Sequence, residues 1–116
     1  RFEQIKKLYL YEYQIVKGKD NYTNLCRRID SMFLANLRVT IMQEVDHSGF
    51  NCIASNKVIE SMICDGCVQG VIKKYDFSKM PAKQKLFCQA IYKKSKLLTY
   101  MMALLQNWKR KRALFR

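Results

Sequence analysis

The chain has 116 residues, of which 49% are hydrophobic, so it is long enough for one domain with a buried core and is not disordered by composition. Its 22 Lys and Arg outnumber its 9 Asp and Glu, which gives a net charge of +13. No apolar run approaches the roughly 18 residues of a membrane span. With a single His, no glycine-rich phosphate loop and no convergent carboxylates, we expect no enzyme, no cofactor and no small-molecule substrate.

In chain order, residues 2–16 carry apolar side chains at helical spacing, and Gly18 ends that helix. A second helix begins near Thr23 or Asn24, with one of them as its cap, and runs through residues 25–45. It either continues unbroken or breaks and restarts before residues 47–49 end it. Residues 50–54 are apolar enough to form a short strand.

Residues 55–74 are the most patterned stretch. Ser55 or Asn56 can cap a helix whose apolar stripe runs through residues 58–63, and Asp65-Gly66 can end it. Residues 67–72 then have strand-like chemistry, and Gly70 favours a bulge. A helix, an Asp-Gly corner and a short strand are typical of the last helix and wing of a winged helix, and equally of an αβ corner in any small α+β domain.

Pro81 suits the first turn of another helix, with Ser78 as its cap. Apolar side chains then recur every three or four residues, which predicts one long helix or two that break near residues 93–95. They are Leu86, Phe87, Ala90, Ile91, Leu97, Leu98, Met101, Met102, Leu105 and Trp108. We therefore expect a mainly α, winged-helix-like domain with a small β-wing over residues 1–76, and a basic helical extension packed on it over residues 77–116.

The positive charge is concentrated towards the C-terminus. Residues 59–116 carry 13 basic and 3 acidic side chains, and residues 77–116 carry eleven Lys and Arg and no acid. A surface that serves only solubility normally mixes both signs. This one-sided charge favours a phosphate-rich partner, bound through the backbone.

The expected nucleic-acid contacts come from the second helix, the candidate last helix, the candidate wing and the basic C-terminal extension. We predict Arg27, Arg28, Lys57, Lys73, Lys74, Lys93, Lys94, Lys96, Lys109, Arg110, Lys111 and Arg112 as contacts, with Arg38 in an alternative register. No Arg is placed for a bidentate contact to guanine, so contacts to the backbone fit better than base readout.

Five cysteines, an odd number, favour a reducing compartment with free and mostly buried thiols. The alternative is a zinc site. Cys64 and Cys67 have C-x-x-C spacing, and His47 and Cys52 complete a set of four ligands. Because His47 and Cys52 form no standard second half-site, we favour the structural interpretation and expect no metal.

Two segments resemble the C-terminal chromatin-binding region of meiotic HORMA-domain chromosome-axis proteins. NKVIESMICDGCV at residues 56–68 is similar to the last helix and first wing strand of their winged helix, with Cys67 in place of an aromatic residue. YDFSKMP at residues 75–81 and the following helix resemble the extension found in fungal members. The resemblance implies a non-catalytic nuclear module that helps a larger axis protein bind DNA or nucleosomes.

Two other functions remain open from the residues alone. The stripe over residues 87–108, with Met101 and Met102, is long enough to pair with a partner helix in a protein–protein interaction module. The Asn21-Tyr22-Thr23 sequon and the basic tail also fit a secreted, cytokine-like helical bundle. The chain begins with Arg1, so we expect a piece of a larger protein, and we expect no membrane partner.

Overall fold

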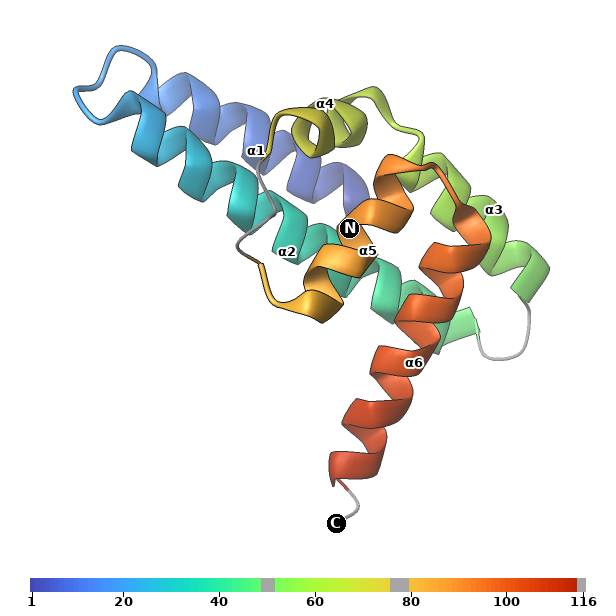
Figure 1. Ribbon diagram of the computed structural model, residues 1–116. Coiled ribbons are helices and arrows are strands. Elements are labelled where there is room, and N and C mark those ends of the chain that lie inside the picture. The colour runs from blue at the N-terminus through green and yellow to red at the C-terminus, as the bar shows by residue number, and fades with distance from the viewer. Residues whose placement is uncertain (49–51, 76–79, 115–116) are drawn as a thin grey trace.

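Helices alone form the secondary structure of the computed structural model, which describes residues 1–48, 52–75 and 80–114 (Figure 1). In chain order they are α1 (Phe2–Val16), α2 (Tyr22–Ser48), α3 (Cys52–Ile63), α4 (Gly66–Lys74), α5 (Ala82–Tyr92) and α6 (Lys96–Leu114). The predicted winged-helix-like fold with a β-wing is wrong, because the described residues contain no strand. None of the described helices is both long and apolar enough to cross a membrane.

The first two helices form an antiparallel hairpin (Figure 1). The sequence prediction for α1 is confirmed, and Gly18 follows it with a φ of +83°, a left-handed conformation that glycine adopts without strain. Ile5, Tyr9 and Val16 are buried on one face of α1. At 27 residues α2 is about 40 Å long and runs without a break, so it provides the surface on which α1, α3 and α6 pack.

The strand predicted for residues 50–54 is not present where the structure describes the chain. Phe50 and Asn51 lie outside the described residues, and Cys52 begins α3. The predicted caps, Ser55 and Asn56, are therefore interior residues of this helix. A short strand here would need a neighbouring strand to pair with, and the only candidate, residues 67–72, is helical.

The segment predicted as the wing is α4. Asp65 does not end a helix at a turn; it caps the next one, because its Oδ1 accepts a hydrogen bond from the backbone N–H of Cys67 at 2.9 Å. Val68, Val71 and Ile72 follow at positions i, i+3 and i+4, and all three are buried. This spacing suits one face of a helix, and burial of that face stabilises α4 more than strand propensity could.

The chain breaks between α5 and α6 at residues 93–95, as one of the two sequence alternatives predicted. Pro81 is the residue that precedes the first turn of α5, whereas Ser78, the predicted cap, lies outside the described residues. The break ends one apolar stripe and allows the chain to reverse direction (Figure 1).

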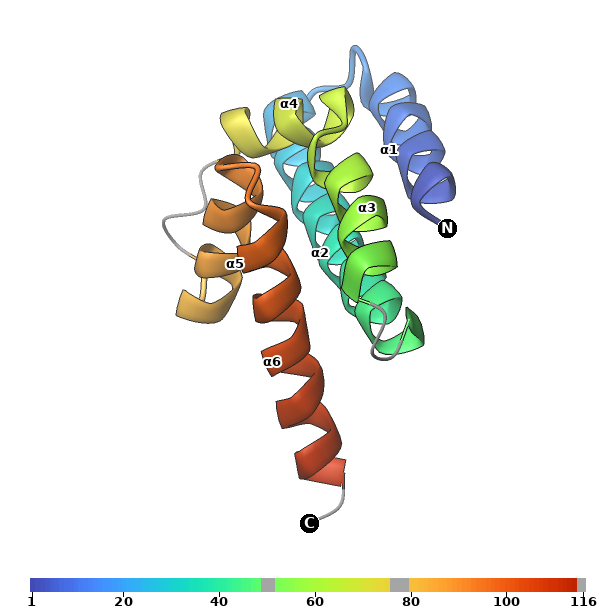
Figure 2. The same ribbon diagram turned by 90° about the vertical axis from the view of Figure 1, so that its right-hand side faces the viewer.

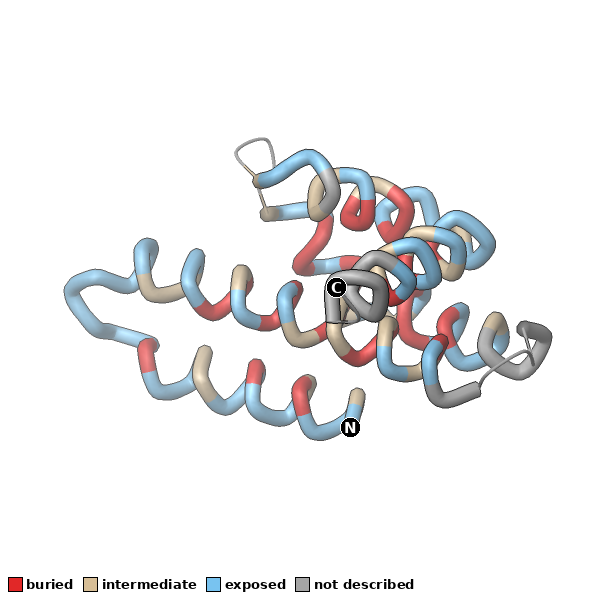
Figure 3. Tube along the Cα trace, turned by 90° about the horizontal axis from the view of Figure 1, so that it is seen from below, coloured by how far each residue is buried: buried red, intermediate tan, exposed pale blue. Residues whose placement is uncertain are grey.

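Two layers of helices result (Figure 2). The first contains α1, α2 and α3, and the second contains α5 and α6, while α4 crosses one end. Between the layers lies the core, whose fully buried side chains include Leu37 and Ile41 from α2, Ile59 and Ile63 from α3, and Phe87 from α5. The buried positions recur along the inward sides of the helices (Figure 3).

One buried amide connects three helices at the end of the molecule that α4 covers. Gln69 of α4 is 6% exposed, and its Nε2 donates to the backbone carbonyl oxygens of Ile63 and Ile91. Ile63 is the last residue of α3, and Ile91 lies in the last turn of α5. The amide therefore fixes the ends of α3 and α5 relative to α4.

Candidate functional site

The predicted cationic contacts lie in several separate groups. They are Arg27 and Arg28 on α2, Lys57 on α3, Lys73 and Lys74 on α4, Lys93 and Lys94 between α5 and α6, and Lys96, Lys109, Arg110, Lys111 and Arg112 on α6. Of residues 109–112 only the helical backbone is described. The start of α2, the α5–α6 turn and the far end of α6 are well apart in Figure 1. These groups do not form a single wing-and-helix surface.

Lys74 belongs to a polar network inside the fold. Its Nζ donates to the hydroxyl oxygens of Tyr13 at 2.8 Å and Tyr9 at 3.1 Å, and both hydroxyls donate to Oδ1 of Asp30, at 2.7 and 2.9 Å. Lys74 Nζ also lies 3.5 Å from Asp30 and 4.5 Å from the centre of the Tyr13 ring. Asp30 is buried, so this lysine balances a carboxylate that water hardly reaches.

The ionisation of the network follows from these contacts. Burial lowers the pKa of Lys74, but hydrogen bonding to Tyr9 and the charge of Asp30 raise it more, so the net shift is upward. Desolvation and the nearby Asp30 raise the pKa of Tyr9 and of Tyr13. At neutral pH the cation of Lys74 is therefore retained, and its partners are two neutral hydroxyls and one carboxylate.

Next to this network is a groove of about 510 Å³. Its lining joins Arg27, Tyr22, Thr23 and Cys26 from α2 to Tyr13, Asp30, Lys74 and Tyr75. The acidic side chain in the lining, Asp30, pairs with Lys74, so the groove has mixed polarity and little excess charge for an anion. We assign no ligand to it.

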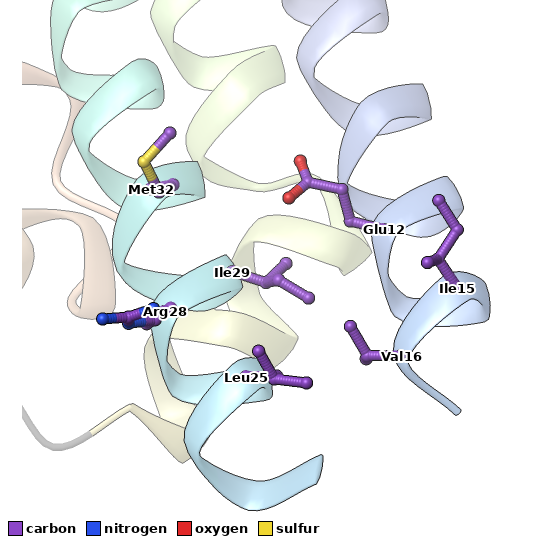
Figure 4. Close-up of a pocket in the computed structure, with 7 residues that line it drawn as sticks. All are labelled: Glu12, Ile15, Val16, Leu25, Arg28, Ile29 and Met32. Atoms are coloured by element: carbon purple, nitrogen blue, oxygen red, sulfur yellow. The ribbon is translucent and has the colours of Figure 1, made fainter. Parts of the chain in front are cut away.

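An apolar pocket of about 300 Å³ lies between α1 and α2, near their connection (Figure 4). Ile15 and Val16 approach it from α1, and Leu25, Ile29 and Met32 approach it from α2. Glu12 and Arg28 lie at its edge, so Arg28, a predicted phosphate contact, borders a shallow apolar depression.

The α5–α6 corner, defined here as Lys93, Lys94 and Lys96, presents three exposed lysines within four residues. Lys96 Nζ pairs with Glu60 Oε2 of α3 at 2.9 Å, an ion pair in which both side chains are about half exposed. Among the described residues, Lys93 and Lys94 make no side-chain ion pair or hydrogen bond.

Lys94 also has an unusual backbone conformation. Its φ of +55° is the left-handed conformation, which L-residues other than Gly and Asn seldom adopt. The surrounding hydrogen bonds, from Ser95 N to Ala90 O at 3.1 Å and from Lys94 N to Ile91 O at 2.9 Å, form a Schellman motif. Lysine therefore occupies the position where glycine would be least strained.

In α6, small or polar side chains face the core and several large apolar side chains face the solvent. Its inward positions are small or polar, namely Thr99, Ala103 and Asn107, each at most 4% exposed. Tyr100 and Met102 are partly buried against the core. Six other large apolar side chains are 48–60% exposed, and we call this set the α6 stripe: Leu97, Leu98, Met101, Leu104, Leu105 and Trp108. Sequence periodicity had grouped most of these residues with the buried Phe87 and Ile91, because it finds an apolar face but not the direction of that face.

The candidate zinc ligands are not brought together among the described residues. Cys64 is exposed and Cys67 is half-buried, both with free thiols, and the side chains of His47 and Cys52 lie outside the described residues. Within the described part of the chain, no group of three His, Cys, Asp or Glu side chains could hold a metal ion. The other described cysteines, Cys26 and Cys88, are also free.

Sequence reasoning missed the partners of Lys74. Tyr9 and Tyr13 were assigned only to the apolar face of α1, and Asp30 was given no role. The available signal was a single acid inside the apolar pattern of α2, between Ile29 and Phe33. A buried carboxylate needs a cation and hydrogen-bond donors, so this position could have pointed to an internal network.

Arg38 is likewise part of the fold. Its Nη1 donates to Gln106 Oε1 of α6 at 3.4 Å, a long contact across the two layers.

Comparison of the chain with protein-family models, curated proteins and solved structures gave no match.

Proposed function

We propose that this protein is a non-catalytic module that binds DNA, free or in chromatin, through the phosphate backbone. The contact surface is the acid-free side formed by α4, α5 and α6. Its cations are Lys73 at the end of α4, the α5–α6 corner, and the basic cluster at residues 109–112.

The observation that carries this proposal is the separation of charge between the two layers. Not one Asp or Glu occurs in α4, α5 or α6, whereas Glu3, Glu12, Asp30, Glu44 and Glu60 all lie in α1, α2 and α3. Because α4 packs against α5 and α5 against α6, the acid-free helices are neighbours in space as well as in sequence (Figure 2). The acids that lie next to these helices are paired, Glu60 with Lys96 and Asp65 with Lys6, so a polyanion that approaches this side meets mainly positive charge.

The α5–α6 corner gives the proposal its most specific residue. Lys94 keeps a positive charge at a backbone position that would be more relaxed with glycine. Lys93 lies beside it, and both side chains are exposed. A strained residue with a free charge at a sharp turn fits a role in binding better than a role in stability.

Other predicted contacts have weaker support. Lys74 is committed to Asp30 and two tyrosines, and Lys96 is paired with Glu60. Arg27 and Arg28 lie at the start of α2, in the layer that also carries the acids. The nuclear location and the meiotic context stay predictions from the resemblance, and the wing on which that resemblance depended is absent from the described residues.

Binding to matched duplex DNA, single-stranded DNA, RNA and nucleosomes across a salt series tests the proposal. Each cation that neutralises a phosphate contributes about 0.9 to the slope of log affinity against log salt on duplex DNA. Lys94→Gly should lower this slope by about that amount. It should also leave stability unchanged or raise it by up to about 1 kcal/mol, because the left-handed conformation no longer costs energy.

Lys17→Ala is the matched control, because it removes one exposed lysine from the α1–α2 turn, away from the acid-free helices. It should leave the slope nearly unchanged. Equal slopes of log affinity against log salt for the wild type and Lys94→Gly would show that the α5–α6 corner does not contact phosphates. Affinity for all four ligands that is weak and independent of salt would refute the proposed function.

A further inference from the structure

The α6 stripe is a second surface, which phosphate binding does not use. Six half-exposed side chains of this size expose roughly 400–500 Å² of apolar surface together, which is within the range of about 300–600 Å² for the largest patch on a typical monomer, a patch that is often functional. The stripe residues Leu97, Met101, Leu104 and Trp108 are spaced 4, 3 and 4 apart. This spacing forms a continuous line along three turns of one helix face.

Contacts made by the inward face of α6 fix the rotation of this helix about its own axis. Asn107 Nδ2 donates to the backbone carbonyl of Met42 in α2 at 2.8 Å, and Arg38 of α2 reaches Gln106. Ala103 is fully buried, and its small side chain lets α6 lie close to its neighbours. Rotating the helix to bury the leucines would break these contacts, so the stripe faces outwards in the folded protein.

Charge restricts what can cover the stripe. Residues 97–108 contain no charged side chain, whereas Lys93, Lys94 and Lys96 precede them and residues 109–112 are all basic. A second copy of this chain would place cations against cations whether the two α6 helices ran parallel or antiparallel. The occupant must therefore be apolar in the middle and acidic at both ends.

Nucleic acid offers the charge but no apolar surface to cover leucines. A bilayer-bound helix carries Lys or Arg along its polar face, beside the apolar face for its whole length. In α6 that opposite face is Thr99, Ala103 and Asn107, packed inside the protein. A protein segment of limited length fits better than a membrane.

We propose that the α6 stripe is a docking site for an amphipathic helix of a partner protein, about three turns long, with carboxylates near both ends of its apolar face. The apolar faces pack as two helices side by side, and the acidic ends pair with the basic ends of α6. The basic ends of α6 are shared with the proposed phosphate contacts, but the apolar stripe between them is not, so loss of apolar docking and loss of DNA binding can be measured separately.

Trp108 is the chain's only tryptophan and lies in the stripe, so its fluorescence reports directly on whether the stripe is covered. The probe is a synthetic helical peptide with Leu at the a and d positions of its central three turns and Glu in the turn on either side. We expect a blue shift of Trp108 emission that saturates and persists in about 0.5 M salt, where exposed charges are screened. A peptide with Lys in place of Glu should bind at least about tenfold more weakly.

Leu104→Gln/Leu105→Gln should weaken peptide binding at least about tenfold, because both positions lose apolar contact. Leu8→Gln/Leu10→Gln is the matched control, since these α1 leucines are 49% and 54% exposed against 48% and 53% for the α6 pair. It should bind the peptide like the wild type. Met101→Gln is a milder stripe variant if the double variant does not fold, with folding checked by circular dichroism.

Several results would overturn the proposal. One is the absence of a shift with the acidic peptide at about 100 μM, which corresponds to an affinity too weak for a specific helix pair. Another is equal binding by the stripe variant and the control. A larger shift with anionic lipid vesicles than with the peptide would assign the stripe to a membrane. A shift that grows with protein concentration, with dimers in sedimentation, would assign it to a second copy.

Discussion

Lys73 and Lys74 are neighbours in sequence, yet the structure gives them opposite roles, and replacing each with Met separates these roles. Lys74 donates to Tyr9 and Tyr13 and lies 3.5 Å from Asp30, whereas Lys73 is exposed without such contacts among the described residues. Met keeps the length of the side chain and its helix propensity, so each substitution removes mainly the charge.

The magnitude follows from burial. Hydrogen bonds to a charged group contribute about 1.5–3 kcal/mol when buried. The side chain of Lys74 is 49% exposed, so solvent screening reduces the loss to about 1–2 kcal/mol, including the cost of leaving Asp30 with one fewer donor. Lys73→Met should change the free energy of unfolding by less than about 0.5 kcal/mol, as exposed substitutions usually do.

Urea unfolding of both variants and the wild type at pH 7 measures these differences. The pKa of Lys74 is raised in the folded state, so its contribution is fully present below the unfolded pKa of about 10.4 and is lost as the pH rises through the higher folded value. The gap between wild type and Lys74→Met should therefore narrow in strongly alkaline solution. Equal stability of the two variants at pH 7 would refute the assignment of Lys74 to an internal network.

Two further predictions concern α4 and the cysteines. Asp65 caps α4 and pairs with Lys6 at 2.7 Å; burial raises its pKa, but Lys6 and the N–H of Cys67 lower it more. Asp65→Ala should cost about 1–2 kcal/mol at pH 7 and Asp65→Asn about 0.5 kcal/mol in urea unfolding, because Asn keeps the cap. The difference between Asp65→Asn and the wild type should vanish as the pH falls through the lowered pKa of Asp65; a difference that persists there would contradict this. Cys64 is exposed, whereas burial raises the pKa of Cys88 to about 11, so alkylation of the native protein near pH 8 followed by peptide mapping should label Cys64 first, and equal rates would count against the described burial.

Local signals predicted α1 well and α4 badly, for the same physical reason. Residues 2–16 have one consistent period and a glycine stop, so the local and tertiary preferences agree. At Asp65-Gly66 the same two residues can end a helix or begin one. The choice depends on whether Val68, Val71 and Ile72 find a core to pack against, which is a tertiary property.

The candidate site also combines features that the sequence predicts with features that depend on tertiary contacts. The acid-free character of residues 77–116 is a property of composition, and the structure places α4, α5 and α6 next to one another. Lys74 is held inside the fold by a carboxylate on α2, whereas Lys73 is exposed, and no sequence pattern around residue 74 predicts this difference. The direction of the α6 stripe depends on what Asn107 contacts, for which the sequence carries no periodic signal.

The amide of Gln69 has a consequence for how this chain can be altered. One side chain from the nine-residue α4 holds the carboxyl ends of α3 and α5, so this amide couples the ends of the two helices in addition to the Schellman motif that closes α5. An insertion or deletion near residues 64–66 moves that amide relative to the carbonyl of Ile63. The short α3–α4 connection therefore tolerates changes in length poorly, even though it lies at the surface.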